Sequence, residues 1–249
     1  MKIVFSRKGF DSASGGGPSP IVDGAPVSLP IPAMLRDGAP VSRTTYGDLG
    51  LGEAVTKASR GKLGASDFAH HDPMFTGGEC LFGQVGTAQS HLANRGVGVG
   101  DVFLFFGLFQ KAGCTPHHRI FGFLKVEQKI SLADCPPEIL AELKAHRHPH
   151  ALAMHGTNDC IYRGPGRIAV NACDVLRLSV PDGQGSPSLW NRPEWLKPDG
   201  LSYHDRADRW LHGRRLQSVA RGQEFVADVG QREAPRRWLD DVIAAINNP

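Results

Sequence analysis

The sequence predicts an α+β fold whose core is a small bent β-sheet or a small β-barrel, with inserted and C-terminal helices. Residues 102–106 (VFLFF) are apolar at every position, which is typical of a strand buried on both faces. Residues 119–126 predict a second strand that forms a hairpin with the first. Residues 235–247 predict a terminal amphipathic helix, because its apolar residues recur at helical spacing: Trp238, Leu239, Val242, Ile243 and Ile246.

The N-terminal elements are expected to be short. Residues 1–6 predict a strand, which ends at the glycine- and proline-rich segment 7–20. The many prolines of residues 21–46 favour extended segments and turns, and residues 46–64 have room for one short helix.

Further elements follow in the middle of the chain. A short helix is expected over residues 87–95, with Thr87 as its N-cap and Gly96 after its C-terminus. Residues 110–118 form the hairpin loop, and Pro136-Pro137 open another helix.

In the last third, short strands are expected near Ile161, at residues 168–170 and at residues 175–180. A loop follows over residues 181–198, and residues 204–221 predict a basic helix. We expect a single domain over residues 1–249, with the helical part from about residue 200 docked on it.

The composition argues against several classes of protein, namely disordered, membrane-spanning, secreted and disulfide-rich chains. With 41% hydrophobic and 21% charged residues, the chain can bury a core and is not disordered. A net charge of +3 is compatible with a nucleic-acid partner only where the positive charge is clustered. The sequence has neither a membrane-length apolar run nor a signal peptide, so we expect a cytoplasmic protein that starts at Met1 and has no membrane partner. The five cysteines lack CxxC spacing and are expected to be free thiols.

The first candidate site is the polar segment after the first strand. Arg7 and Lys8 supply positive charge, and the glycines allow backbone N–H groups to approach an anion. Asp11 is a candidate general base. This composition suits a phosphate or nucleotide, although neither GxxxxGKS nor GxGxxG is present. The expected ligand-binding residues of this segment are Ser6, Arg7, Lys8, Ser12, Gly15 and Gly16.

Histidines form the second candidate group. His71 and Asp72 are candidate catalytic residues, next to His70. Residues 146, 148 and 150 are alternating histidines that would point to one side of an extended segment, as metal ligands do. An exposed basic turn explains them more simply, so no metal site is assigned and the cofactor is left open.

Two more groups have polar side chains suited to nucleic acid. Gln84, Gln89 and His91 surround the predicted helix 87–95 and have side chains able to bind a base edge or a ribose, or simply to cap and hydrate the surface. The arginines of residues 204–221 would follow a phosphate backbone or form a solvated helix face.

Several of these stretches together resemble one family, the third nucleotide modification associated domain family. The resemblance rests on residues 2–12, on Gly15-Gly16, on the segments 18–21 and 28–32, and on the later segments 83–92, 100–107 and 222–226. It implies a bacterial or phage protein that makes or recognises a modified base, with a nucleotide, DNA or other proteins of the modification system as partners. It supplies no catalytic residues.

A second resemblance concerns the fold. Residues 100–106 and 119–126 are similar to the core hairpin of PUA-like barrels, which implies binding of nucleic acid or a flipped base. The sequence therefore leaves two hypotheses open: a nucleotide- or nucleic-acid-acting protein, and a non-catalytic PUA-like reader of a modified base. In the reader, the stacking aromatic side chains would come from Phe10, Tyr46, Trp190 or Trp195.

Overall fold

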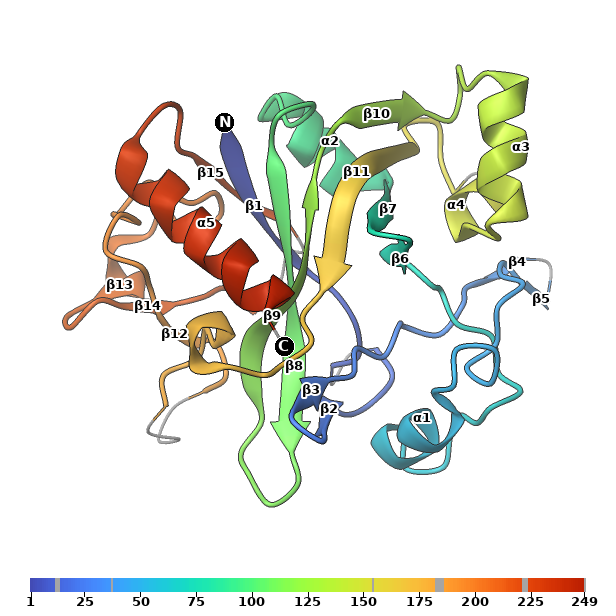
Figure 1. Cartoon of the computed structure of the whole chain (residues 1–249), viewed down its shortest axis with the longest axis horizontal. Coiled ribbons are helices and arrows are strands. Elements are labelled where there is room, and N and C mark those ends of the chain that lie inside the picture. Colours follow the sequence, from blue (N-terminus) through green and yellow to red (C-terminus); the bar gives the residue numbers. More distant parts are fainter. Residues whose placement is uncertain (12–13, 37, 154, 182–185, 221–223, 249) are drawn as a thin grey trace.

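The computed structural model describes residues 1–249 except 12–13, 37, 154, 182–185, 221–223 and 249. Figure 1 shows a twisted sheet with α5 on one side and α3 and α4 at the opposite edge of the molecule. In chain order the elements are β1 (Lys2–Arg7), β2 (Ser19–Val22), β3 (Ala25–Pro26), β4 (Leu35–Arg36), β5 (Ala39–Pro40), α1 (Gly52–Ala58), β6 (Met74–Thr76), β7 (Glu79–Gln84), α2 (Gly86–Asn94), β8 (Val102–Lys111), β9 (His117–Lys125), β10 (Gln128–Ser131), α3 (Pro137–Ala145), α4 (Pro149–Leu152), β11 (Cys160–Ile168), η1 (Asp174–Leu176), β12 (Leu189–Asn191), η2 (Ala207–Arg209), β13 (Trp210–Leu211), β14 (Arg215–Gln217), β15 (Glu224–Asp228) and α5 (Glu233–Asn247).

The main sheet runs in the order β15-β1-β8-β9-β11-β7-β6, with β2, β3 and β10 joined beside this path. Strand β1 lies between β15, to which it is antiparallel, and β8, to which it is parallel. Strands β8 and β9 form the predicted hairpin. The sheet therefore places the end of β1, where Lys8 follows, beside the middle of β8.

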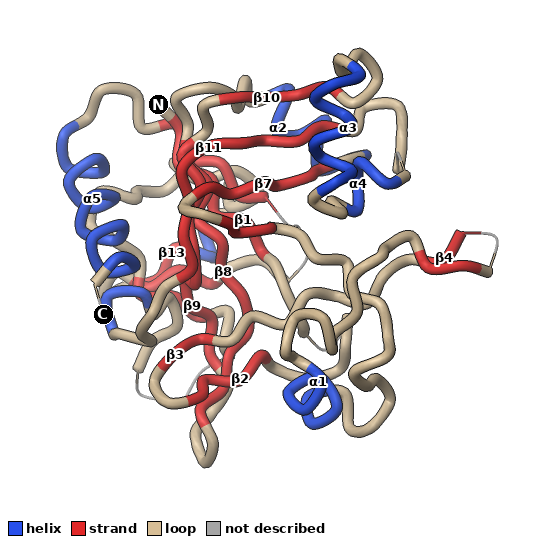
Figure 2. The backbone as a smooth tube through the Cα atoms, turned by 45° about the vertical axis from the view of Figure 1, so that its right-hand side comes forward, coloured by secondary structure: helices blue, strands red, loops and turns tan. Residues whose placement is uncertain are grey.

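The sheet bends along β11: in Figure 2, β10, β7 and the part of β11 beside them run nearly across the direction of β8 and β9. The first six residues of this strand pair with β7, whereas Gly166–Ile168 pair with β9. The predicted bent sheet with inserted and C-terminal helices is confirmed. The barrel alternative is wrong for the described residues, because the strand order has two free ends and closes no barrel.

The two faces of the central strands bury different cores, because alternate side chains point to opposite sides. Ile3 and Phe5 of β1 face α5, which contributes Leu239 and Val242 to the same cluster. Val4 faces the other side, where α2 and the strands β7 and β11 cover the sheet. The predicted terminal helix is thus confirmed, and it packs on its own chain.

Three local predictions were wrong. Residues 204–221 do not form a helix: the described residues hold η2, β13 and β14, because Gly213 and Arg214 have positive φ angles in the turn between the two strands. The N-cap of α2 is Val85 rather than Thr87, and Asn158 Oδ1 accepts the Gly86 N–H in place of a local cap. The strand expected at residues 175–180 is instead η1 followed by isolated bridges.

All five cysteines are free, as predicted. Within the described part of the chain, no helix has both the length and the apolar character that crossing a membrane requires.

Candidate functional site

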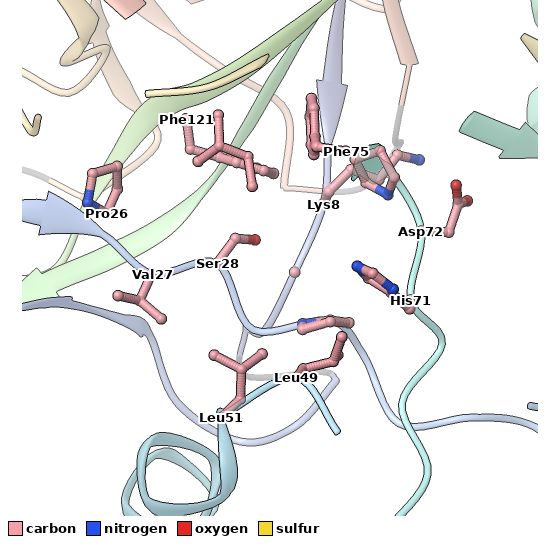
Figure 3. Close-up of a pocket in the computed structure, with 14 residues that line it drawn as sticks. Lys8, Pro26, Val27, Ser28, Leu49, Leu51, His71, Asp72, Phe75 and Phe121 are labelled. Carbon is pink, nitrogen blue, oxygen red and sulfur yellow. The ribbon is translucent and has the colours of Figure 1, made fainter. Parts of the chain in front are cut away.

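A cleft of about 290 Å³ opens beside the end of β1 (Figure 3). Its polar lining comes from three segments: Lys8 after β1, Ser28 after β3, and His71 with Asp72 before β6. In Figure 3 the side chains of Lys8, His71 and Asp72 surround the same opening. Apolar side chains and prolines make the remaining walls, among them Pro26, Val27, Pro30, Leu49, Leu51, Phe75, Phe121 and Ile168.

The carboxylate and the imidazole of this cleft have shifted pKa values. Burial alone raises the pKa of Asp72, but the approach of His148, His150 and His70 outweighs it and holds that pKa well below its usual range. The Gly83 N–H also donates to Asp72 Oδ1 at 2.9 Å. Burial lowers the pKa of His71, and the charge of Asp72 only partly opposes this. Asp72 is therefore ionised and His71 neutral near pH 7, the states of an acceptor and a general base.

A buried network centred on Glu224 lies next to Lys8. Glu224 Oε1 accepts hydrogen bonds from Ser6 Oγ at 3.1 Å, from Lys8 Nζ at 2.9 Å and from Gln84 Nε2 at 2.7 Å. The second carboxylate oxygen, Oε2, is buried and has no hydrogen-bond partner among the described residues. Three predicted ligand-binding residues thus meet at a carboxylate that sequence reasoning did not single out.

Behind the cleft, four histidines and two aspartates form what we call the histidine cluster: His70, Asp72, His148, His150, His155 and Asp159. His70 and Asp72 come from the loop before β6, and His155 and Asp159 from the loop before β11. His148 is the N-cap of α4, and His150 lies within that helix. Within the described residues, two sets place their ligand atoms within 4.8 Å of one another, as a metal site requires: His70, Asp72 and His150, and His150, His155 and Asp159. His148 and His150 are buried, so the interpretation of that segment as an exposed turn was wrong for both, and only His146 is exposed.

Electrostatics favours a neutral imidazole at His70 and an ionised carboxylate at Asp159. Burial lowers the pKa of His70 to about 3, although Asp72 opposes the shift. Burial raises the pKa of Asp159, but hydrogen bonds from His150 and His155 outweigh it and lower that pKa to about 2. Neutral imidazole and carboxylate are the protonation states that bind metal ions.

The glycine-rich segment is folded on itself. Asp11 Oδ1 accepts the Ser14 N–H, and the Gly16 N–H is donated to the Asp11 carbonyl oxygen. Gly15 lies on the ring of Phe10, where a Cβ would come within 2.3 Å of Cγ. Ser12 lies outside the described residues. Asp11 does not line the cleft, so the structure does not join it to His71 and Asp72 there.

The remaining predicted ligand-binding residues have partners inside the protein. Arg7 donates to the carbonyl oxygens of Val219 and Ala220, and burial lowers its pKa against the opposing charge of Asp11. Gln89 is buried and accepts the hydrogen bond of the Tyr162 hydroxyl at 3.0 Å, and His91 Nε2 lies 3.0 Å from Ser202 Oγ.

The four aromatic side chains expected to stack on a base are buried. Phe10 and Tyr46 pack against each other under α1, and Trp190 and Trp195 lie in the core beneath α5. Their expected role in stacking on a base is therefore wrong. Phe75 and Phe121 line the cleft instead.

A second cleft of about 740 Å³ lies between α5 and the β12–β14 region. Basic and acidic side chains are mixed along it, including Arg177, Arg192, Asp174 and Glu194. The first cleft, where a cation, an imidazole and a carboxylate converge, is therefore the candidate functional site.

In a comparison with protein families, the family described as nucleotide modification associated domain 3 matches residues 2–228. No curated protein and no solved structure matches the chain.

Proposed function

Since the chain belongs to the nucleotide modification associated domain 3 family, we propose that it binds one nucleotide unit in the cleft at Lys8, His71 and Asp72 and acts on it within a base-modification system. The observation that carries the proposal is the convergence of these three polar side chains on one opening with apolar walls. A volume of about 290 Å³ lies at the low end of small-molecule sites, roughly 300–1,000 Å³, and suits one base or mononucleotide. The nucleotide unit is either free or a flipped base of DNA.

Phosphate would be held on the Lys8 side of the cleft. Lys8 keeps part of its side chain exposed while it pairs with Glu224, so its ammonium group has donors left for an anion. Gly9 lines the cleft beside it and has a positive φ angle, which brings backbone close to the opening. The loop around Gly15 and Gly16 contributes less than the sequence indicates, because the Gly16 N–H is already donated.

The base would lie against the aromatic wall. Phe75, which is half-buried, lines the cleft on the side away from His71, and base–aromatic stacking contributes about 1–3 kcal/mol per base. Phe121 is buried and only supports this wall. His71 and Asp72 then face the polar edge of the base or the sugar, where a neutral imidazole accepts a proton. In this proposal His71 and Asp72 are the catalytic residues. Asp11, the third residue predicted to be catalytic, does not line the cleft and has no role in it.

The first test is fluorescence anisotropy of labelled 12-nucleotide DNA, single-stranded and duplex, over a salt series with nucleoside monophosphates as competitors. We expect the affinity for DNA to fall as the salt concentration rises. We also expect one nucleoside monophosphate to displace the labelled DNA. Mass spectrometry of the bound strand then separates turnover from a reader, which binds in a stoichiometric ratio without changing the strand. Absence of binding to every strand and every nucleotide would overturn the proposal.

A charge-balanced variant tests the role of Lys8. Replacing Lys8 and Glu224 together (Lys8→Gln with Glu224→Gln) removes the cation without leaving a buried carboxylate unpaired. We expect weaker DNA binding and a salt slope smaller by about 1, as for the loss of one phosphate contact. An unchanged slope would remove Lys8 from the phosphate site.

A further inference from the structure

We propose that His70, Asp72 and His150 bind one divalent transition-metal ion, with His148 as a fourth ligand and Asp159 orienting His150. The proposal stands on the geometry of the histidine cluster and does not depend on the proposed function.

The spacing of the side chains fits a metal site better than a hydrogen-bonded core. The distances to the Asp72 carboxylate are 3.9 Å from His70 Nε2, 3.6 Å from His148 Nε2 and 3.8 Å from His150 Nε2. Each is too long for a hydrogen bond. Ligand atoms about 2.0–2.2 Å from a tetrahedral ion lie roughly 3.3–3.6 Å from one another. The ligand atoms of His70, Asp72 and His150 already lie within 4.8 Å of one another, so a small contraction would form the site. His148 lies outside this set and would join the ion through a larger shift.

Several buried nitrogen atoms in the cluster have no hydrogen-bond partner among the described residues. Both ring nitrogens of His148, which is fully buried, lack a hydrogen bond among the described residues, as does Nδ1 of His70. A buried polar atom left unpaired is unfavourable, because it has lost its hydrogen bonds to water. His148 Nε2 lies on the Asp72 side of the ring, so an ion bound to Asp72 would satisfy it.

The atoms around the proposed ligands fix their orientation. His150 Nδ1 is hydrogen-bonded to Asp159 Oδ1, which leaves Nε2 of the same ring toward Asp72. Asp159 Oδ2 accepts the backbone N–H of His155 at 2.8 Å, and Asp72 Oδ1 accepts that of Gly83 at 2.9 Å. A carboxylate on the far nitrogen of a ligating histidine is a recurrent feature of metal sites. Because Asp159 is engaged in this way, we favour the set with Asp72 over the set of His150, His155 and Asp159.

The ligands indicate the class of metal and its place. Imidazole and carboxylate ligands suit Zn²⁺ and Fe²⁺ rather than Mg²⁺ or Ca²⁺. Asp72 lines the cleft as well as the cluster, so the ion would lie at the cleft wall.

The test is metal binding by the full chain without nucleotide. Protein stripped with a chelator is titrated with Zn²⁺, and separately with Fe²⁺ under anaerobic conditions, by calorimetry; Co²⁺ absorption reports the coordination. We expect one equivalent of metal and a four-coordinate Co²⁺ spectrum. His70→Gln and His150→Gln should each weaken binding at least 100-fold, and Asp159→Asn about 10–100-fold.

His146→Gln is the matched control, because His146 is exposed and two residues from His148. Its affinity should equal that of the wild type. Wild-type protein that binds neither Zn²⁺ nor Fe²⁺ at one equivalent would overturn the proposal, as would equal affinity in His150→Gln with circular dichroism unchanged. Nucleotide binding is measured separately on stripped and loaded protein, so failure of the metal site and failure of the proposed function are distinguishable.

Discussion

Gly83 lies directly against the ring of His150: a Cβ at Gly83 would stand 2.4 Å from Cδ2 and 2.6 Å from Cγ of that ring. The N–H of the same glycine donates to Asp72 Oδ1. One residue of β7 therefore positions two proposed ligands, by leaving space for an imidazole and by holding a carboxylate.

Gly83→Ala should displace His150 and weaken Zn²⁺ binding by at least tenfold, with a stability cost of about 1–3 kcal/mol from overpacking. Calorimetric titration and urea unfolding measure the two effects. Gly98→Ala is the control, because no described residue other than its two chain neighbours comes within 4 Å of a Cβ at Gly98. Equal Zn²⁺ affinity in both variants would show that the position of the His150 ring does not matter for the metal.

Glu224→Gln should destabilise the fold by about 1–3 kcal/mol, because it removes the counter-charge of the largely buried Lys8 ammonium group. The double variant with Lys8→Gln should recover part of that loss. Urea unfolding of the two single variants and the double variant gives the coupling energy. Strictly additive losses would mean that the ion pair contributes nothing beyond the separate side chains.

The central sheet could be predicted because its strands are apolar on both faces, as in residues 102–106. The fold of residues 204–221 could not be predicted, because their arginine-rich sequence is typical of a helix. The described residues of this segment instead form η2 and two short strands, joined by a turn in which Gly213 and Arg214 have positive φ angles. There the pairing of β14 with β12 buries Leu216 and Trp190 and outweighs local helix propensity.

The histidine cluster was visible in the sequence only as two separate groups. His70 and His150 lie 80 residues apart, and the pairing of β7 with β11 brings the loop before β6 close to helix α4. No local spacing encodes such a contact. The sequence around Glu224 contained a weak signal. Glu224 is a single acidic residue directly before the apolar residues Phe225-Val226-Ala227, and such a position is typical of a buried charge that has a partner elsewhere in the chain.

His118 should make stability depend on pH. Trp190 Nε1–H donates to His118 Nδ1 at 3.0 Å. Burial, with repulsion from Arg7 and His117, lowers the pKa of His118 to about 3. The unfolded chain has a pKa of about 6.5 at this residue, so between these values only the unfolded state is protonated. Stability contributed by neutral His118 is therefore full above pH 6.5 and falls as the pH decreases toward 3.

Urea unfolding of wild type and His118→Gln at several pH values between 6.5 and 4.5 checks this. The slope of stability against pH should be smaller in the variant, by up to about 1.4 kcal/mol per pH unit. His212→Gln, in the exposed turn after β13, should leave the slope unchanged. Equal slopes in wild type and His118→Gln would contradict the prediction.

Phe75→Leu should weaken binding of single-stranded DNA by about 5–150-fold, which corresponds to the loss of about 1–3 kcal/mol of base stacking. The ring of Phe75 is held edge-on against Phe105 with centroids 5.8 Å apart, and the missing side chain of Gly122 leaves room for it. Leucine keeps the apolar contact but removes the flat surface. Phe68→Leu is the control, since Phe68 does not line the cleft. Anisotropy titrations measure the DNA affinity of both variants. If Phe75→Leu binds DNA as tightly as the wild type, or is weakened only as much as Phe68→Leu, the base does not lie against Phe75.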